Sequence, residues 1–411
     1  MKKIEYAVIG GGASGLILAN ALAKQLKSQG KTARVVLFER LDRVGKKLSA
    51  TGNGQGNITN VAALKTDYFT FSGKQPLAQK ILSAFDPQSL REFFLALGVP
   101  LCADERGRVY PASRQASALT DALRFALSEQ GVELCLSAKV TRLQKSGAEF
   151  EITVETQSGT QVYTAKKVAL CTGGKAAKNF GTDGSAYALA QGFGHTVTPL
   201  YPSLVQLKTD TAYIKSLKGI RVAGGKLTAY TPTGKHVFQG DIIFTDYGVS
   251  GDAVFRASAY LADQIESGKV RISIDFLPEI SEKEIVEILK NKQSAFSALE
   301  KNELLFGVVN NQIGRAIFKR ANGDLQKAAA LVKDFSLQVN GSLGFDYAQV
   351  TKGGIALNEI TDELESRLVD GLYFAGEALD VDGPCGGFNL QWAYSSARTV
   401  AAAMAKDRGQ V

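Results

Sequence analysis

Gly10-Gly11-Gly12-Ala13-Ser14-Gly15 is the stretch of sequence that decides the fold. It follows an apolar, strand-like run at 3–10 and precedes residues 13–27, where apolar side chains recur at helical spacing. A second strand is predicted over 33–39. In the pattern G-x-G-x-x-G the glycines permit a tight turn, a close approach of phosphates to the backbone, and close packing of helix on strand. The helix N-terminus offers free N–H groups to a pyrophosphate. This stretch therefore predicts a βαβ unit that binds a dinucleotide.

An acidic residue ends the second predicted strand. Glu39 lies 24 residues after Gly15, where a carboxylate accepts hydrogen bonds from a ribose diol and repels a 2′-phosphate. The glycine pattern and Glu39 together indicate a dinucleotide site, but they do not by themselves separate FAD from NAD. The alternative is a glycine-rich turn without a ligand.

The C-terminal part of the chain favours FAD. A strand and acid over 371–377 resemble the element that returns under the flavin ribityl chain in glutathione-reductase-like flavoproteins. Paired glycines then open an apolar helix over 389–406, whose N-terminus is predicted to face the flavin pyrimidine edge. The alternative is a plain Gly-Gly turn before a surface helix. The cofactor residues assigned to this region are Gly376, Glu377, Gly386, Gly387, Phe388, Asn389 and Leu390.

Residues 45–60 are dense in Gly, Asn and Thr, which predicts neither a packed strand nor a regular helix. We expect a loop whose backbone approaches the cofactor closely, and a surface loop is the alternative. The turn after a predicted strand at 167–170 is also placed near the flavin. The cofactor residues assigned to these and other segments are Arg40, Lys46, Lys47, Leu48, Thr51, Gly52, Asn53, Asn57, Val140, Thr172, Gly173 and Gly174.

The order of predicted elements indicates a discontinuous chain organisation. We predict an α/β fold: a three-layer, Rossmann-like FAD-binding domain from residues 1–195 and 350–411. Short strands and turn signals predict an inserted antiparallel β-rich domain over 196–278 and 335–349. Residues 279–334 have helical periodicity, with apolar positions at Ile285, Leu289, Leu304 and Val308, and predict a small helical domain.

Taken together, these motifs resemble the BaiN/YhiN-like flavoprotein family, which includes aminoacetone oxidase. The resemblance covers essentially the whole chain, and its further landmarks lie at 107–111, 172–175, 244–251 and 371–393. It implies non-covalent FAD, an inserted barrel-like domain and a helical lid domain. One departure stands out: family members usually have Gly-Arg-Cys-Asn where this chain has Gly54-Gln55-Gly56-Asn57.

The resemblance implies hydride transfer at flavin N5 but spans several substrates. The first hypothesis is a reductase in which a protein acid completes addition to a conjugated C=C bond. Tyr247, Asp246 and Cys385 are the candidate proton donors, and Lys352 is a candidate to neutralise reduced flavin or bind a substrate carboxylate. Three of them also have an ordinary structural interpretation: Tyr247 as a packing or capping residue, Cys385 as a small residue in a tight turn, and Lys352 as a solvated lysine.

Two further hypotheses stay open. One is an oxidase that acts on a small amine and releases hydrogen peroxide. The other is a flavoprotein that modifies or binds RNA, since the net charge of +8 permits an acidic partner. NAD(P)H is a candidate reductant, although the chain has no second G-x-G-x-x-G pattern. Cations in the helical segment that could contact phosphates are Lys290, Lys292, Arg315, Lys319 and Arg320.

Composition narrows the class of protein. Hydrophobic content of 45% and charged content of 21% are typical of a globular protein, and no long apolar run predicts a membrane span. The four cysteines are far apart and only two histidines are present, so we expect neither a zinc site nor another metal. We expect a cytoplasmic protein that acts on a small molecule.

Overall fold

The computed structural model describes residues 1–406 and divides the chain into two compact units. Unit 1 comprises Met1–Leu200 and the C-terminal part of the chain from Val350 onward. Unit 2 comprises Tyr201–Gln349. Each unit has its own hydrophobic core. No helix among residues 1–406 is long and apolar enough to cross a bilayer.

Unit 1 is built on a five-stranded parallel sheet in the order β20-β11-β2-β3-β7. Four of its strands, β20, β11, β2 and β3, are nearly continuous buried apolar runs, as expected for a parallel sheet covered on both faces. β2 and β3 are joined through helix α1, which confirms the predicted βαβ unit. The bounds are β2 Tyr6–Ile9, α1 Ala13–Ser28, β3 Val35–Phe38, β7 Glu133–Cys135, β11 Lys167–Leu170 and β20 Leu372–Phe374.

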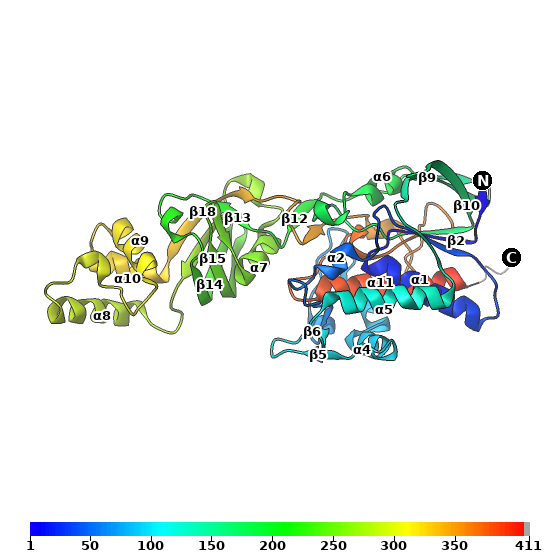
Figure 1. Cartoon of the computed structure of the whole chain (residues 1–411). Coiled ribbons are helices and arrows are strands. Elements are labelled where there is room, and N and C mark those ends of the chain that lie inside the picture. The colour runs from blue at the N-terminus through cyan, green and yellow to red at the C-terminus, as the bar shows by residue number, and fades with distance from the viewer. Residues whose placement is uncertain (407–411) are drawn as a thin grey trace. The chain divides into compact units, whose positions relative to one another are not determined.

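Different layers cover the two faces of this sheet. Helices α1, α5 (Ala116–Gln130) and α11 (Phe388–Ala405) lie together on one face, so the blue N-terminal and red C-terminal helices are neighbours (Figure 1). On the other face lies a four-stranded sheet, which the rings of Phe38 and Tyr163 join to β3 at 5.0 Å. The predicted three-layer, Rossmann-like architecture is confirmed. The strands of this second sheet are β1 Lys2–Lys3, β8 Lys139–Ser146, β9 Glu149–Thr156 and β10 Gly159–Ala165.

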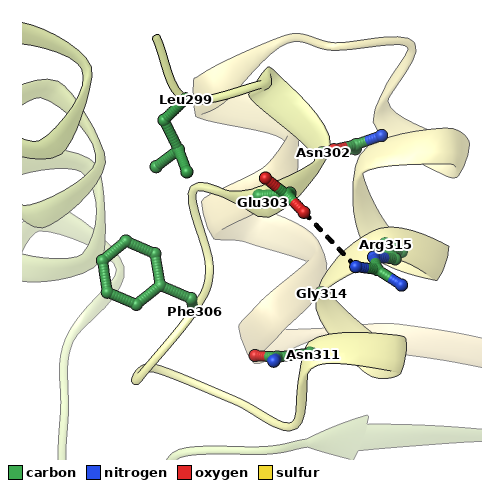
Figure 2. A pocket seen from close by; sticks show the side chains of 7 residues that line it. All are labelled: Leu299, Asn302, Glu303, Phe306, Asn311, Gly314 and Arg315. Carbon is green, nitrogen blue, oxygen red and sulfur yellow. Dashed lines mark hydrogen bonds and ion pairs between the residues drawn. The ribbon is translucent and has the colours of Figure 1, made fainter. Parts of the chain in front are cut away.

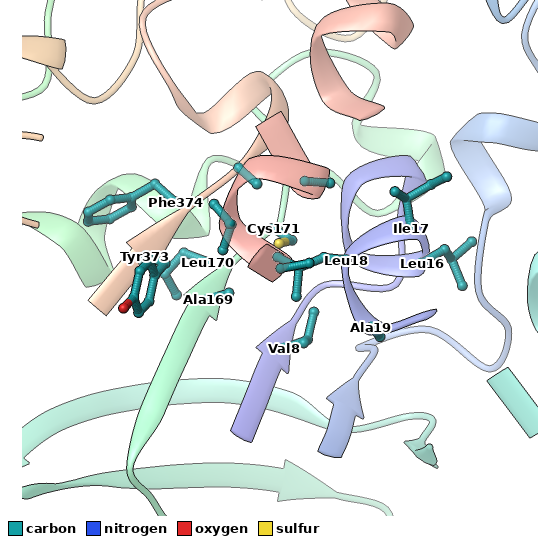
Figure 3. Packing of buried hydrophobic residues seen from close by; sticks show 14 of the residues in the cluster. Val8, Leu16, Ile17, Leu18, Ala19, Ala169, Leu170, Cys171, Tyr373 and Phe374 are labelled. Carbon is teal, nitrogen blue, oxygen red and sulfur yellow. The ribbon is translucent and has the colours of Figure 1, made fainter. Parts of the chain in front are cut away.

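The core of unit 1 forms where α1 packs on the central strands. Figure 3 shows Val8 of β2 and Leu18 of α1 beside Leu170 and Cys171 at the end of β11. All of these side chains are buried. Close packing here fixes the positions at which β2 and β11 end.

Smaller elements complete unit 1. A three-stranded sheet contains β4, β6 and β5, and short helices surround it. Contrary to the prediction of a loop without regular structure, Lys46–Ser49 forms the one-turn helix α2 and Thr59–Asn60 forms strand β4. The turn begins at Gly45, whose φ of 69° is left-handed and suits glycine. The remaining bounds are α3 Gln75–Ala84, α4 Pro87–Ala96, β5 Leu101–Ala103, β6 Arg108–Pro111, α6 Ser185–Gln191 and β19 Val350–Lys352.

Unit 2 contains the inserted barrel. Six antiparallel strands close in the order β13-β16-β15-β14-β17-β18, which confirms the predicted barrel-like insertion. Residues 231–234 form the turn that joins β14 to β15. The bounds are β12 Tyr201–Ser203, β13 Leu207–Thr209, β14 Arg221–Thr231, β15 Gly234–Phe244, β16 Gly248–Ser250, α7 Asp252–Leu261, β17 Arg271–Asp275 and β18 Phe335–Ser342.

The predicted helical segment contains α8 (Glu282–Ala295), α9 (Asn311–Ala321) and α10 (Leu325–Lys333). Its apolar side chains share one core with the barrel. Leu304 and Val308, which the periodicity placed on a helix, instead lie in turns between Glu303 and α9. The physical reason is local: Gly307 has a left-handed φ of 68°, and the Asn310 side chain caps α9 by accepting from Gln312 N.

A buried histidine anchors the segment through which the chain leaves unit 1. His195 is 3% exposed, and its Nε2 lies 2.7 Å from Ser366 Oγ while its Nδ1 lies 3.3 Å from a Glu359 carboxylate oxygen. Burial lowers the pKa of His195 below its usual 6.5, and Glu359 opposes that shift. The folded state therefore keeps the imidazole neutral at pH values where the unfolded chain takes up a proton.

This arrangement predicts a pH dependence of stability. Because the folded pKa of His195 is depressed, its contribution is fully present above about pH 6.5 and is lost as the pH falls through and below that value. The free energy of unfolding in urea, measured at about pH 7.5 and about pH 5.5, should fall more in the wild type than in His195→Gln. The exposed His236 provides a control, His236→Gln, which should behave as the wild type. Equal pH dependence in His195→Gln and the wild type would contradict the interpretation.

Candidate functional site

The predicted cofactor segments converge at one edge of the parallel sheet. The fingerprint follows β2, Glu39 follows β3, the turn 172–174 follows β11, and Glu377 follows β20. Because all these strands are parallel, their carboxyl ends share one edge. Strand β3 lies on one side of β2 and β11 on the other, so a topological switch point lies between β2 and β11. Open α/β sheets bind ligands at this position.

The three fingerprint glycines have distinct physical roles. A Cβ on Gly10 (φ 106°) would lie 2.5 Å from Cys171 O, and a Cβ on Gly15 would lie 1.8 Å from Gly10 O. Both glycines are therefore needed for the close approach of strand, turn and helix. Gly12 differs, because a Cβ there would meet nothing within 4 Å. The space beside Gly12 is open to a ligand.

The N-terminus of α1 fits a pyrophosphate. Gly12 is its N-cap, provides no side-chain cap, and the first turn carries no acid. The leading N–H groups of a sixteen-residue helix thus face the open space with positive potential. Nearby, the buried Thr172 Oγ1 has no hydrogen-bond partner among the described residues. These features suit the diphosphate of FAD, which would be held by Gly12, Ala13 and Ser14.

Glu39 has two tasks at the end of β3. Its Oε2 accepts from Gly11 N at 2.7 Å and its Oε1 accepts from Leu41 N at 2.9 Å. The side chain is 9% exposed, and this burial raises its pKa, while the two N–H donors oppose the rise. Each carboxylate oxygen keeps a second acceptor site for a ribose hydroxyl. The residue therefore holds the glycine loop and is placed to bind the ribose.

We expect removal of the Glu39 carboxylate to cause loss of the cofactor. Glu39→Ala should purify without yellow colour and should also unfold at a lower temperature as apoprotein, because the Gly11 N–H loses its buried acceptor. The neighbouring Asp42 is exposed, so Asp42→Ala is the matched control and should keep its flavin. The flavin absorbance per protein and the apoprotein melting temperature provide the two readouts. Full flavin occupancy in Glu39→Ala would contradict the assignment.

An ion pair and the hydrogen bonds around it connect four segments that are far apart in the sequence, at the same edge of the parallel sheet. Lys47 Nζ of α2 lies 2.7 Å from Glu377 Oε2, and Glu377 Oε1 accepts from Thr351 N at 3.0 Å. The hydroxyl of Thr351 accepts from Lys175 N and Ala176 N, in the turn after β11. Lys47 and Glu377 were predicted from sequence. Thr351 was not, since it follows the inserted unit and no local pattern marks it.

The second predicted anion site is the N-terminus of α11. Gly387 (φ 98°) is its N-cap, without a side-chain cap, and a Cβ there would lie 2.4 Å from Thr59 O. The Asn57 amide is placed to donate to Thr59 O at 3.1 Å and accept from Gly387 N at 3.3 Å. The Asn389 side chain bonds both ways with Gly383, so it shapes the preceding turn. Only its backbone remains to contact a ligand.

The departure from the family pattern has a structural counterpart. Gln55 is exposed, whereas Gly56 is buried with a φ of 80°. A Cβ at position 56 would lie 3.0 Å from Ala116 Cα and 3.1 Å from Leu119 Cδ1. A cysteine at this position would need both a strained backbone and displaced neighbours, so the loop is built around glycine.

The other assigned cofactor residues lie around the same edge in different settings. Arg40 pairs with Asp183 and donates to Gly181 O at 3.4 Å. The side chains of Leu48 and Val140 belong to the core, which leaves their backbones as possible contacts. The residues Thr51, Gly52 and Asn53 lie in the partly exposed loop after α2, and Lys46, Gly173, Gly376, Phe388 and Leu390 lie at the strand and helix ends already described.

The candidate catalytic residues lie in both units. Cys385 is half-buried in the turn before α11, and Lys352 is 4% exposed on β19 with its Nζ 4.0 Å from the Phe69 ring centre; both belong to unit 1. Tyr247 and Asp246 lie in the turn between β15 and β16 of unit 2. The exposed Lys218 ion pair, at 2.7 Å, holds the pKa of Asp246 below its usual range, which makes Asp246 a poor proton donor.

Unit 2 also has a pocket of its own. It measures about 300 Å³ and lies in the helical segment, with Phe306 on one side and the Glu303–Arg315 pair, 3.3 Å apart, on the other (Figure 2). Both charged side chains are largely exposed. None of its lining residues except Arg315 was singled out from sequence. Among residues 1–406, no group of three or more His, Cys, Asp or Glu side chains could hold a metal ion.

The similarity to known proteins extends over nearly the whole chain. A family model described as the HI0933-like protein Rossmann domain matches residues 4–403. A 3-dehydro-bile acid delta(4,6)-reductase of Clostridium scindens is 35% identical over 407 residues, 95% of this chain and 96% of that protein. A ribosomal RNA dihydrouridine synthase of Haemophilus influenzae is 28% identical, with 98% of both chains covered.

Among solved structures, the open conformation of a flavocytochrome c3 fumarate reductase is similar in fold. Its TM-score is 0.52 at 16% identity, and the match covers 99% of this chain and 79% of that one. At this identity the similarity concerns the fold alone. It agrees with the parallel sheet and inserted unit described above.

Proposed function

This chain belongs to the HI0933-like family of FAD-dependent oxidoreductases, and on that premise we propose that it binds FAD and reduces a conjugated C=C bond. The family resemblance predicted from sequence is thereby confirmed. The observation that carries the proposal is the convergence of the glycine fingerprint, Glu39, the turn after β11 and Glu377 at one sheet edge. An extended dinucleotide needs several anchoring points along one edge, and this chain supplies them from both of its ends.

Bound FAD would supply hydride transfer at N5, and the protein would orient both partners and complete the addition with a proton. The N-terminus of α11 is suited to stabilise negative charge on the pyrimidine side of the ring, because its leading N–H groups have no side-chain cap. Lys352 would add a buried positive charge. It follows Thr351, which contacts Glu377, so it lies on the strand that borders the site.

The proton donor we propose is one of two groups. Tyr247 and Cys385 remain candidates, and Asp246 is disfavoured because Lys218 holds it as a carboxylate. A donor must lie within hydrogen-bond reach of the carbon or oxygen that it protonates. Tyr247→Phe and Cys385→Ala separate the two, since each removes one donor group and leaves the rest of the side chain in place.

The substrate class we favour is a conjugated ketone with a carboxylate. The bile acid reductase of Clostridium scindens is the more similar of the two relatives described, at 35% identity against 28%. A reductase acting on such a molecule needs an electron donor, for which NAD(P)H is the candidate. Small amines are the alternative substrates if the protein is an oxidase.

Ribosomal RNA is the second candidate substrate, favoured by the dihydrouridine synthases of Haemophilus influenzae and Escherichia coli. Three of the cations predicted to contact phosphates are engaged inside unit 2. Lys292 donates to Leu304 O, Arg315 pairs with Glu303, and Arg320 donates to Ser336 O. These contacts weaken the case for a phosphate-binding face on the helices.

Anaerobic stopped-flow absorbance tests the proposal. Purified protein is mixed with NADH or NADPH, the flavin band is followed, and air is then admitted. A reductase is expected to bleach with one nicotinamide and to recover slowly in air. Bleaching by a small amine alone, with fast recovery and release of peroxide, would instead identify an oxidase.

A further inference from the structure

We propose that Thr351 is a positioning residue for the cofactor, because its hydroxyl fixes the turn after β11 and its backbone N–H fixes Glu377. This inference rests on the proposed function, namely that unit 1 binds FAD at the sheet edge. Thr351 belongs to β19, the strand with which the chain re-enters unit 1. Neither the glycine fingerprint nor the helix N-termini include it.

The Thr351 hydroxyl holds the turn after β11. Thr351 is 1% exposed, and its Oγ1 accepts from Lys175 N at 2.8 Å and from Ala176 N at 3.0 Å. One hydroxyl thus supplies the acceptor for two successive backbone N–H groups of the turn. A buried N–H without an acceptor is costly, so this hydroxyl determines the path of residues 174–176.

The Thr351 backbone N–H orients the acid that follows β20. Thr351 N donates to Glu377 Oε1 at 3.0 Å, which leaves Oε2 aimed at Lys47 Nζ, 2.7 Å away. Glu377 and Lys47 are partly buried, at 19% and 25% side-chain exposure, so the direction of the carboxylate matters. The threonine therefore sets the orientation of an ion pair in which both partners are proposed cofactor residues.

Close packing makes this arrangement specific. A Cβ on Gly174 would lie 2.5 Å from Thr351 Oγ1 and 2.8 Å from Glu377 Oε1. The turn, the hydroxyl and the carboxylate meet at one point that only glycine can occupy at position 174. A shift of the Thr351 hydroxyl would therefore also move the turn and the Glu377 carboxylate.

The start of the re-entry segment is itself anchored in unit 1. Gly354 N donates to Thr198 Oγ1 at 2.9 Å, and Thr198 N donates to Gly354 O at 2.9 Å. A Cβ on Gly353 would lie 2.1 Å from Pro199 O. The outgoing and returning segments are thus paired next to Thr351, which gives its side chain a defined position without help from a ligand.

The test compares Thr351→Val with Thr351→Ser. Valine has the shape of threonine but no acceptor, whereas serine keeps Oγ. Apoprotein is titrated with FAD and binding is followed by quenching of flavin fluorescence, while the apoprotein melting temperature reports folding. We expect Thr351→Val to bind FAD about tenfold or more weakly, and Thr351→Ser to stay within about threefold of the wild type. Thr164→Val, which alters a buried threonine of β10, is the control and should bind as the wild type.

The outcomes separate this inference from the proposed function. Wild-type protein that does not bind FAD would overturn the proposed function. Tight binding by both the wild type and Thr351→Val would overturn the inference alone. Binding by Thr351→Ser as weak as that of Thr351→Val would show that retaining the hydroxyl does not preserve FAD binding, and it would also overturn the inference. If Thr351→Val does not fold, Thr351→Cys replaces it in the test, because the thiol is close in size to the hydroxyl but is only a weak acceptor.

Discussion

Gly12→Asp is expected to give a folded protein that purifies without flavin. A Cβ at position 12 meets nothing within 4 Å, and the backbone there, with φ of −81°, accepts any residue. Aspartate is moreover a favoured N-cap, so the apoprotein should keep its stability or gain a few tenths of a kcal/mol. The same carboxylate would occupy the space proposed for the pyrophosphate and would repel it. We expect FAD affinity to fall by about 100-fold or more.

Two measurements check this expectation. The flavin-to-protein absorbance ratio gives occupancy, and circular dichroism with thermal melting gives the state of the apoprotein. Gly12→Asn is the matched control, because it has the same size and capping ability without the charge, and its affinity should fall less. A yellow Gly12→Asp protein with full occupancy would place the pyrophosphate elsewhere.

Gly15→Ala is expected to damage the fold itself. The added methyl group would lie 1.8 Å from Gly10 O, which is far inside van der Waals contact with the backbone of the preceding turn. The helix could accommodate it only by moving away from β2, where Leu16 and Leu18 are fully buried. We expect the free energy of unfolding to fall by more than about 3 kcal/mol, which is beyond the usual cost of overpacking.

Urea unfolding of the apoprotein measures this loss. The comparison variant is Gly12→Ala, which adds the same methyl group three residues earlier in open space and should lower the unfolding midpoint far less, by no more than the modest cost of alanine at an N-cap. If the two alanine variants unfold at the same urea concentration, then Gly15 does not have the packing role described here.

Much of unit 1 could be predicted because its signals are local. The βαβ unit is marked by three glycines, an apolar strand and a helical apolar period within forty residues, and the C-terminal strand and helix are marked in the same way. The barrel could be predicted as β-rich from its short strands and turns. Its closure could not, since β13 pairs with β18 across more than a hundred residues.

Several features of the candidate site depend on long-range contacts and could not be predicted from local sequence patterns. The helix α2 was missed because its start depends on the left-handed Gly45, which a loop-like composition hides. Thr351 was missed because its partners at 175, 176 and 377 are brought to it only by the sheet order. In contrast, Glu39 was found, but its second task of holding Gly11 could not be inferred from spacing. Long-range contacts of this kind have no sequence period.

The central claim is that this protein uses FAD to reduce a conjugated C=C bond, and one measurement tests it most directly. The flavin is reduced anaerobically with light and EDTA as the electron donor, the protein is mixed with a 3-oxo bile acid carrying conjugated C=C bonds, and both the flavin absorbance and the mass of the product are recorded. The account predicts return of the oxidised flavin spectrum together with a product that has gained two hydrogen atoms, one as hydride and one as a proton. A reduced protein that stays bleached with this compound, with other enones and with ribosomal RNA, yet reoxidises at once in air, would contradict it.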